Sequence, residues 1–223
     1  KAIDPVAADE GRQFARLAGW PRYVEARMYS SRPSLRDRPV GGWEPPAFDR
    51  EAACFLDIET TGLSPATYLF LIGLMYFRDG GFVVEQVFAR HYGEEPAVLR
   101  YVHDTLKRFE SLVTYNGARF DIPFIETRLA AHRGRPLEPI ASVDLLYTAR
   151  KEFRGILPNN RLGTVERHIR GIERTGDIPG AHIPGAYHDY VRTGDARAMK
   201  NVLYHNRMDL FTMAMLINRL QQC

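Results

Sequence analysis

The sequence predicts an α/β domain built on a mixed central sheet with helices on its faces. Three observations lead to this expectation. Three β-rich runs follow one another between residues 52 and 90, helical and β-rich segments alternate from residue 94 onward, and a long helical pattern closes the chain. Strands joined by a tight turn pair antiparallel, whereas strands joined through helices pair parallel. We therefore expect three antiparallel strands followed by parallel ones.

The domain organisation follows from composition. Hydrophobic residues make up 45% of the 223 residues, which is enough for one well-cored domain. We assign residues 51–223 to that domain and residues 1–50 to an N-terminal helix followed by an extended arm rich in Pro and Arg. Cys54 and Cys223 form no paired framework, which favours a reducing, cytoplasmic location. No apolar run reaches the roughly 18 residues of a membrane span, so no membrane partner is expected.

Each element of the domain has its own signal. The first strand alternates small and apolar residues and ends in Asp57 and Glu59 before a Thr-Thr-Gly turn. The next two β-rich runs flank an Asp-Gly-Gly turn, which is a hairpin signal. Apolar spacing then predicts the remaining elements. In chain order, the elements are strands over residues 52–59, 68–77 and 82–90, a helix over 94–110, a strand over 111–115, a helix over 121–133, a strand ending at 142–144, a helix through Tyr147, and a long helix that contains His205 and Asp209.

Asp57 and Glu59 form the first candidate site. Side chains two apart on a strand point to the same side, so both carboxylates meet at one place. Like charges held so close raise each other's pKa, and a divalent cation relieves that repulsion. The pair predicts a metal site if the chain supplies further acids elsewhere. The alternative is an exposed strand end with two solvated acids.

Asp121 and Asp209 are the candidates for the further acids. Asp121 follows a strand and an Asn-Gly turn, and it begins a helix with Pro123 in its first turn. Considered alone, Asp121 is interpreted as an N-cap. His205 and Asp209 are four residues apart and share one face of the last helix. Considered alone, they are interpreted as an exposed pair.

The order of the three segments indicates a family. Asp57-x-Glu59-Thr-Thr-Gly, Asn116-Gly-x-x-Phe120-Asp121 and His205-Asn-x-x-Asp209 resemble the three motifs of the DEDD exonucleases, the DnaQ-like branch of the ribonuclease H superfamily. Within that branch the chain resembles YprB-like ribonuclease H-like domains. That likeness also includes the segments 143–146, 161–166 and 177–184. The resemblance implies a ribonuclease H-like fold and a 3′–5′ exonuclease.

The resemblance also implies roles for individual residues. Two Mg²⁺ or Mn²⁺ ions would be bound, with Asp57 bridging both. Glu59 and Asp209 would complete the site of the attacking water, and Asp121 would hold the second ion. His205 would orient or deprotonate that water. Oxygen ligands suit these hard cations, and the chain has no Cys/His ligand set for zinc.

The third motif departs from the family pattern. Members with a histidine mostly place it five residues before the last Asp, and members with a tyrosine place it four before. Here Tyr204 is five residues before Asp209 and His205 is four before. On a helix, a four-residue step returns within about 40°, and a five-residue step lands about 140° away. We assign the role to His205, with Tyr204 as the alternative if the helix begins after it.

The turns beside the acids are expected to bind the strand end. The candidate substrate-binding residues are Thr60, Thr61, Gly62, Leu63, Asn116 and Phe120. Core packing is the alternative for Leu63 and Phe120. Four arginines could line a phosphate groove, although a solvated face is the expectation for three of them, Arg161, Arg167 and Arg174. Asp144 is interpreted as a helix cap and not as a ligand.

The expected partner is single-stranded nucleic acid with a free 3′ end, DNA slightly favoured over RNA. A net charge of +3 permits such a partner without requiring it. One alternative is a module that binds nucleic-acid ends or a protein without cleaving, but such a module has no physical reason to keep four converging negative charges near a polyanion. Another is a metal-dependent phosphotransferase or integrase-like enzyme, which would transfer strands or cut internally.

Overall fold

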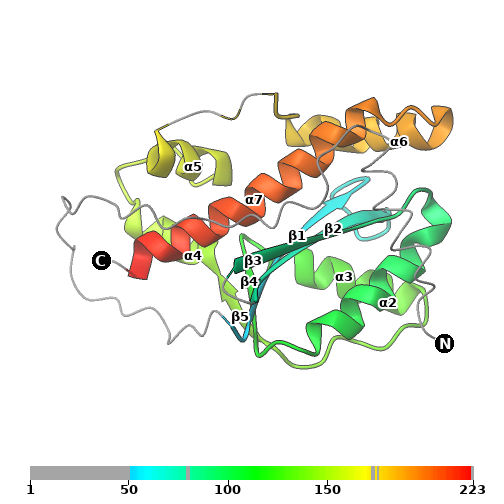
Figure 1. The fold of residues 1–223 in the computed structure, drawn as a ribbon, viewed down its shortest axis with the longest axis horizontal. Coiled ribbons are helices and arrows are strands. Elements are labelled where there is room, and N and C mark those ends of the chain that lie inside the picture. Colours follow the sequence, from blue (N-terminus) through cyan, green and yellow to red (C-terminus); the bar gives the residue numbers. More distant parts are fainter. Residues whose placement is uncertain (1–50, 79–80, 172–173, 175, 222–223) are drawn as a thin grey trace.

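A mixed five-stranded sheet forms the centre of the computed structural model, which describes residues 51–78, 81–171, 174 and 176–221. The strand order is β3-β2-β1-β4-β5 (Figure 1). The first three strands pair antiparallel, and β4 and β5 run parallel to β1. The predicted mixed sheet is therefore confirmed. The strands are β1 (Ala53–Thr60), β2 (Leu69–Arg78), β3 (Gly81–Phe88), β4 (Ser111–Thr114) and β5 (Ala141–Asp144).

The predicted helices occur in the predicted order but with different bounds, and the one expected through Tyr147 extends to Glu152. The expected helix over 94–110 ends at Leu106, and the one over 121–133 ends at Ala131. Two further helices, α5 and α6, were not predicted. The expected helix and arm within residues 1–50 lie outside the described residues. The helices are α2 (Glu95–Leu106), α3 (Asp121–Ala131), α4 (Leu145–Glu152), α5 (Leu162–Arg170), α6 (Ile183–Thr193) and α7 (Arg197–Gln221), with 3-10 turns η1 (Tyr92–Glu94) and η2 (Gly180–His182).

Alternation along β1 divides the core into two clusters. Cys54, Leu56 and Ile58 belong to the cluster that includes α2 and α3. Ala53 and Phe55 belong to the cluster that includes α4, α5 and the second half of α7. Because successive side chains alternate between the two faces of a sheet, Asp57 and Glu59 continue the row of Ala53 and Phe55. Figure 1 shows α7 crossing the sheet on this side, opposite α2 and α3.

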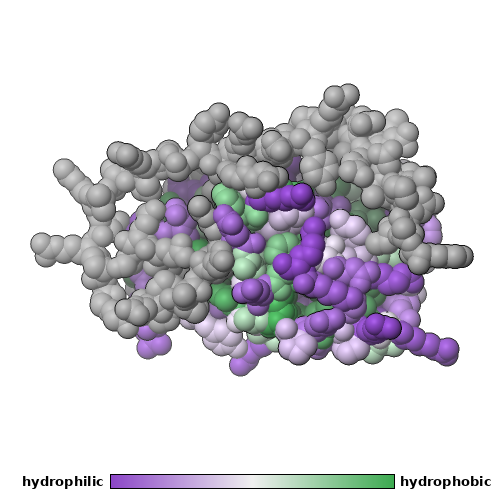
Figure 2. Space-filling model, turned by 60° about the horizontal axis from the view of Figure 1, so that its bottom comes forward, coloured by the Kyte–Doolittle hydropathy of each residue, from purple (hydrophilic) through white to green (hydrophobic). Residues whose placement is uncertain are grey.

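The lower side of the domain in Figure 1 has both hydrophilic and hydrophobic residues on its surface. Figure 2 turns the lower side of Figure 1 forward and shows hydrophilic side chains around a central strip of hydrophobic ones. Among the described residues, no helix combines the length and the apolar character that crossing a bilayer needs.

Candidate active site

The end of β1 carries the first two acids. Asp57 lies opposite Gly73 of β2 and Glu59 lies opposite Leu71, and the register shifts directly after Glu59. Such an irregularity ends regular pairing and often re-aims side chains next to functional sites. Both carboxyl side chains are partly buried under α7. The alternative of two solvated acids at an exposed strand end is therefore wrong.

Asp121 is brought to the same place by the turn after β4. Asn116 adopts a left-handed backbone with φ of 68°, which Asn tolerates better than most residues. The following Gly117 packs so closely on Thr114 that a Cβ would lie 2.4 Å from the Thr114 Cβ. Asp121 then begins α3, buried to 6% exposure. The N-cap position is Phe120, so the interpretation of Asp121 as an N-cap is wrong.

The third motif lies on one face of α7, as predicted. His205 Nε2 is 3.6 Å from Asp209 Oδ2, and the two side chains are 19% and 16% exposed. The interpretation as an exposed pair is wrong. Because α7 begins at Arg197, Tyr204 lies within the helix, and its ring is covered by the Arg207 guanidinium at 5.8 Å. The condition under which Tyr204 would replace His205 is thus not met.

Electrostatics shows that the four acids share one environment. Burial raises the pKa of Asp57 well above its ordinary value, and Asp209, Glu59 and Asp121 raise it further. Burial also raises the pKa of Glu59, with Asp209 and Asp121 adding to the effect. Burial, together with Asp144 and Asp209, raises the pKa of Asp121 to about 7, although backbone hydrogen bonds of Asp121 and Ile58 oppose the rise. Three motifs far apart in sequence therefore form one strongly repulsive carboxylate cluster.

Arg174 and Asp177 belong to this site and were missed as site residues. The Arg174 guanidinium lies 2.5 Å from Asp209 Oδ1, 2.5 Å from Glu166 Oε2 and 3.2 Å from Asp177 Oδ2. Its side chain is only 8% exposed, so the expectation of a solvated face is wrong for Arg174. Arg161 and Arg167 are exposed, as expected.

Asp177 contacts the predicted catalytic histidine. His205 Nδ1 lies 2.9 Å from Asp177 Oδ1. An ionised carboxylate only accepts hydrogen bonds, so Nδ1 carries the proton in this contact and Nε2 is left as the basic nitrogen. The segment beginning at Asp177 was noted in the sequence for its family likeness, but no spacing connected it to His205.

The donor chemistry of the cluster fits a hard divalent cation, because all four acids offer oxygen. Within the described parts of the chain, no three His, Cys, Asp or Glu side chains are already arranged as a metal-binding group. One oxygen of Asp209 is engaged by Arg174. The four acids therefore suit the cation in chemistry.

The turn after β1 is held together by its own hydroxyls. Thr60 Oγ1 donates to the Gly62 carbonyl at 2.7 Å, and Thr61 Oγ1 accepts from the Tyr68 amide at 2.9 Å. Leu63, at the tip of this turn, is 87% exposed, so core packing is wrong for Leu63.

The two candidate substrate-binding residues on the turn after β4, Asn116 and Phe120, differ in exposure. Asn116 is exposed. Phe120 is partly buried, with its ring 5.6 Å from that of Phe124, so it contributes to the core. Asp144 caps α4 through the Leu146 amide and also accepts from the amides of Asn116 and Ala118, which confirms the cap. Asp144 thereby holds the Asn116 turn beside β5.

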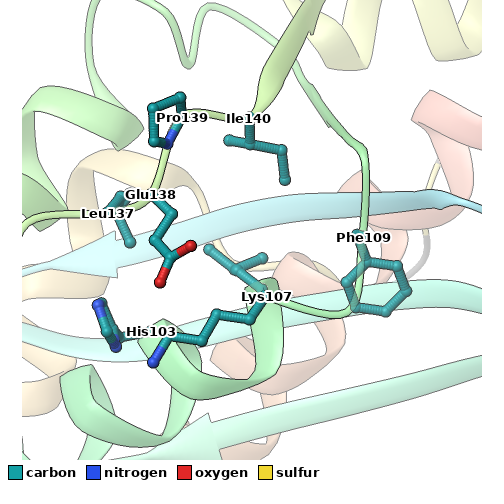
Figure 3. A pocket seen from close by; sticks show the side chains of 8 residues that line it. His103, Lys107, Phe109, Leu137, Glu138, Pro139 and Ile140 are labelled. Carbon is teal, nitrogen blue, oxygen red and sulfur yellow. The ribbon is translucent and has the colours of Figure 1, made fainter.

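A small hollow of about 110 Å³ lies away from the acids (Figure 3). Its wall includes Phe109, two residues before β4, and Ile140, directly before β5, whereas the acids lie at the other ends of the strands. No predicted site residue lines it. It is lined by His103, Leu106, Lys107, Phe109, Leu137, Glu138, Pro139 and Ile140.

Known proteins share this sequence pattern and fold. A family model described as the RNase H superfamily matches residues 54–221. The uncharacterized protein YprB of Bacillus subtilis (strain 168) is 32% identical over 170 residues, which cover 74% of this chain but only 41% of that protein. A structure of the family B DNA polymerase from the hyperthermophilic archaeon Pyrobaculum calidifontis matches with a TM-score of 0.63 at 20% identity, over 81% of this chain and 25% of that one, and shows the shared fold. The predicted likeness to YprB is confirmed, and the chain belongs to the RNase H superfamily.

Proposed function

We propose that the chain is a metal-dependent 3′–5′ exonuclease that hydrolyses single-stranded nucleic acid. One observation carries the proposal: four acids from three segments, Asp57, Glu59, Asp121 and Asp209, lie close enough that Asp121 and Asp209 raise the pKa of both Asp57 and Glu59. Such a cluster is costly in a protein that binds nothing there, and membership in a superfamily named for a nuclease supports hydrolysis of nucleic acid in general terms. The direction of digestion and the two-ion mechanism are the finer parts of the proposal.

Each of the four acids has its own proposed role in binding the cations. Divalent cations such as Mg²⁺ or Mn²⁺ supply activation of the attacking water and neutralisation of the leaving oxygen. Asp57 would bridge two ions, Glu59 and Asp209 would complete the position at the attacking water, and Asp121 would complete the position at the leaving group. In the proposed reaction the water oxygen bonds to phosphorus as a water proton passes to His205, and the bond from phosphorus to the 3′ oxygen of the preceding nucleotide breaks. That oxygen takes a proton from solvent, so the products are the shortened strand with a 3′-hydroxyl and a nucleoside 5′-monophosphate.

His205 is the proposed general base. Its Nδ1 is paired with Asp177, so Nε2 is the nitrogen able to accept a proton from the attacking water. In support of this role, His205 Nε2 is 3.6 Å from Oδ2 of Asp209, a proposed ligand of the cation that would hold the attacking water. Asp177 would hold the ring in this tautomer, as a carboxylate does for a base in other hydrolases.

The strand end would enter beside the turns after β1 and β4. Leu63, almost fully exposed at the tip of its turn, has the chemistry to pack on a base. Gly62 allows close approach of the backbone, and Thr60, Thr61, Asn116 and Phe120 complete the proposed substrate contacts. DNA is the slightly favoured substrate over RNA.

Digestion of 5′-labelled single-stranded DNA and RNA with Mg²⁺ or Mn²⁺ tests the proposal. Asp57→Asn removes one proposed ligand, and Asp189→Asn is the matched control, because Asp189 is 71% exposed and its carboxylate pairs with the equally exposed Arg192. We expect a ladder that shortens from the 3′ end, lost with EDTA and with Asp57→Asn and kept with Asp189→Asn. A ladder that Asp57→Asn still produces would contradict the assignment. Tight binding of ends without cleavage would favour the binding module.

A further inference from the structure

Asn206, the neighbour of the proposed base on α7, makes contacts that the proposed mechanism does not yet use. Its side chain is fully buried, at 0% exposure, between α7 and the sheet. Its Nδ2 donates to Asp57 Oδ2 at 2.8 Å and to the Asp57 carbonyl oxygen at 3.2 Å. Two hydrogen bonds to one residue fix both the strand and the carboxyl group that it carries.

Gln86 of β3 fixes Asn206 in turn. Gln86 Nε2 donates to Asn206 Oδ1 at 2.9 Å and to the Leu203 carbonyl oxygen at 2.8 Å. These partners also determine which end of the Asn206 amide is which, since Gln86 Nε2 is a donor and the Asp57 oxygens are acceptors. The amide of Asn206 is therefore held at both ends and cannot turn without losing hydrogen bonds in a buried place.

Gly73 provides the space for this arrangement. In the register of the sheet, Asp57 of β1 lies opposite Gly73 of β2, and Gly73 lies opposite Gln86 of β3. A Cβ on Gly73 would lie 2.2 Å from Asn206 Oδ1. The row of Asp57, Gly73 and Gln86 thus forms a seat for Asn206, and any side chain at the middle position would displace it.

We propose that Asn206, seated over Gly73 and held by Gln86, is a positioning residue that sets the orientation of the Asp57 carboxylate toward the bound cation. A neutral amide is suited to this task, because it binds one carboxylate oxygen without adding a positive charge that would compete with the cation. A lysine or arginine in place of Asn206 would bind the carboxylate oxygen but would also add a positive charge that competes with the cation. This inference rests on the proposed function, since it takes Asp57 as a metal ligand.

The test measures Mn²⁺ affinity by calorimetry, together with kcat and KM on a single-stranded oligonucleotide. Asn206→Ala removes the contact to Asp57, and Gln86→Ala leaves Asn206 in place but frees its far end. Asn201→Ala is the matched control, because Asn201 is exposed on the same helix. We expect the Mn²⁺ Kd to rise about tenfold in Asn206→Ala and severalfold in Gln86→Ala, in line with the loss of partners around a metal ligand. The kcat falls in parallel and KM for the oligonucleotide stays within about twofold.

The two variants also separate positioning from packing. Because they act on Asp57 through the same chain of contacts, the double variant should raise the Kd no further than Asn206→Ala alone. If Asn206→Ala does not fold, Gln86→Ala on the edge strand carries the test by itself. An unchanged Kd and kcat in folded Asn206→Ala, or in Gln86→Ala when Asn206→Ala does not fold, would overturn the inference.

Failure of the inference and failure of the proposed function give different results. If the wild type cleaves and Asp57→Asn does not, yet the Asn206 and Gln86 variants behave like Asn201→Ala, the exonuclease stands and the positioning role is wrong. If the wild type binds Mn²⁺ but cleaves nothing, a raised Kd in Asn206→Ala still supports the positioning role, while the nuclease assignment falls.

Discussion

Replacing Asp121 by Asn should stabilise the metal-free protein while abolishing its activity. Burial and the neighbouring acids raise the pKa of Asp121 from 3.8 to about 7. At about 1.4 kcal/mol for each pH unit, this rise corresponds to roughly 4 kcal/mol of folding free energy. Because the pKa is higher in the folded state, this stability is present below about pH 4 and is lost as the pH rises through about 7. Asn cannot ionise, so the variant avoids the loss.

The assay is thermal unfolding in EDTA as a function of pH. At pH 8 the Asp121→Asn variant should unfold about 10 °C above the wild type, and near pH 4 the two should coincide. Asp189→Asn, at a position 71% exposed, should follow the wild type throughout. Mn²⁺ should raise the midpoint of the wild type at pH 8 more than that of the variant. A variant that is less stable than the wild type at pH 8, or a difference independent of pH, would refute the reasoning.

Three further predictions concern the surroundings of the acids. Leu63→Ala should leave the unfolding midpoint unchanged, since Leu63 is 87% exposed, but raise the KM for single-stranded DNA roughly tenfold through lost apolar packing on the base; an unchanged KM would remove Leu63 from the substrate site. Gly117→Ala should lower stability in urea by about 1–3 kcal/mol because its Cβ would meet that of Thr114 at 2.4 Å, whereas Gly163→Ala, with open space around it, should not; equal effects would contradict the packing argument. Arg174→Ala should cost about 3 kcal/mol in EDTA because it removes the guanidinium that pairs with partly buried Asp209, and Mn²⁺ should offset part of this loss; an unfolding midpoint equal to that of exposed Arg161→Ala would show that the ion pair contributes nothing.

Much of the fold could be predicted because its signals are local. The alternation in β1, the Asp-Gly-Gly turn of the hairpin and the helical spacing of α2, α3 and α7 each lie within a few consecutive residues. The helices α5 and α6 were missed because residues typical of turns stand near their starts. Helix α5 is short and has Gly163 in its first turn, and α6 has Pro184 as its second residue, and proline also marks loops.

The proposed ligands could be found from sequence because chemistry restricts their residue types and three ordered motifs carried them. The residues that contact these proposed ligands could not be found from sequence. Arg174 and Asp177 reach the site from a connecting segment, and Asn206 acquires its role only where α7 crosses β1, β2 and β3. Gly73 and Gln86 belong to the seat through strand register, which depends on pairing between segments and not on spacing along the chain. Such contacts exist only after the sheet and α7 have packed.

The most direct test of the central claim compares linear and circular single-stranded DNA of the same sequence with Mn²⁺. An enzyme that hydrolyses from a free 3′ end must degrade the linear strand to nucleoside monophosphates and leave the circle intact. Asp57→Asn should leave both intact, and Asp189→Asn should behave as the wild type. Nicking of the circle by the wild type would instead indicate internal cutting, and it would contradict the proposal that these four acids form an exonuclease site.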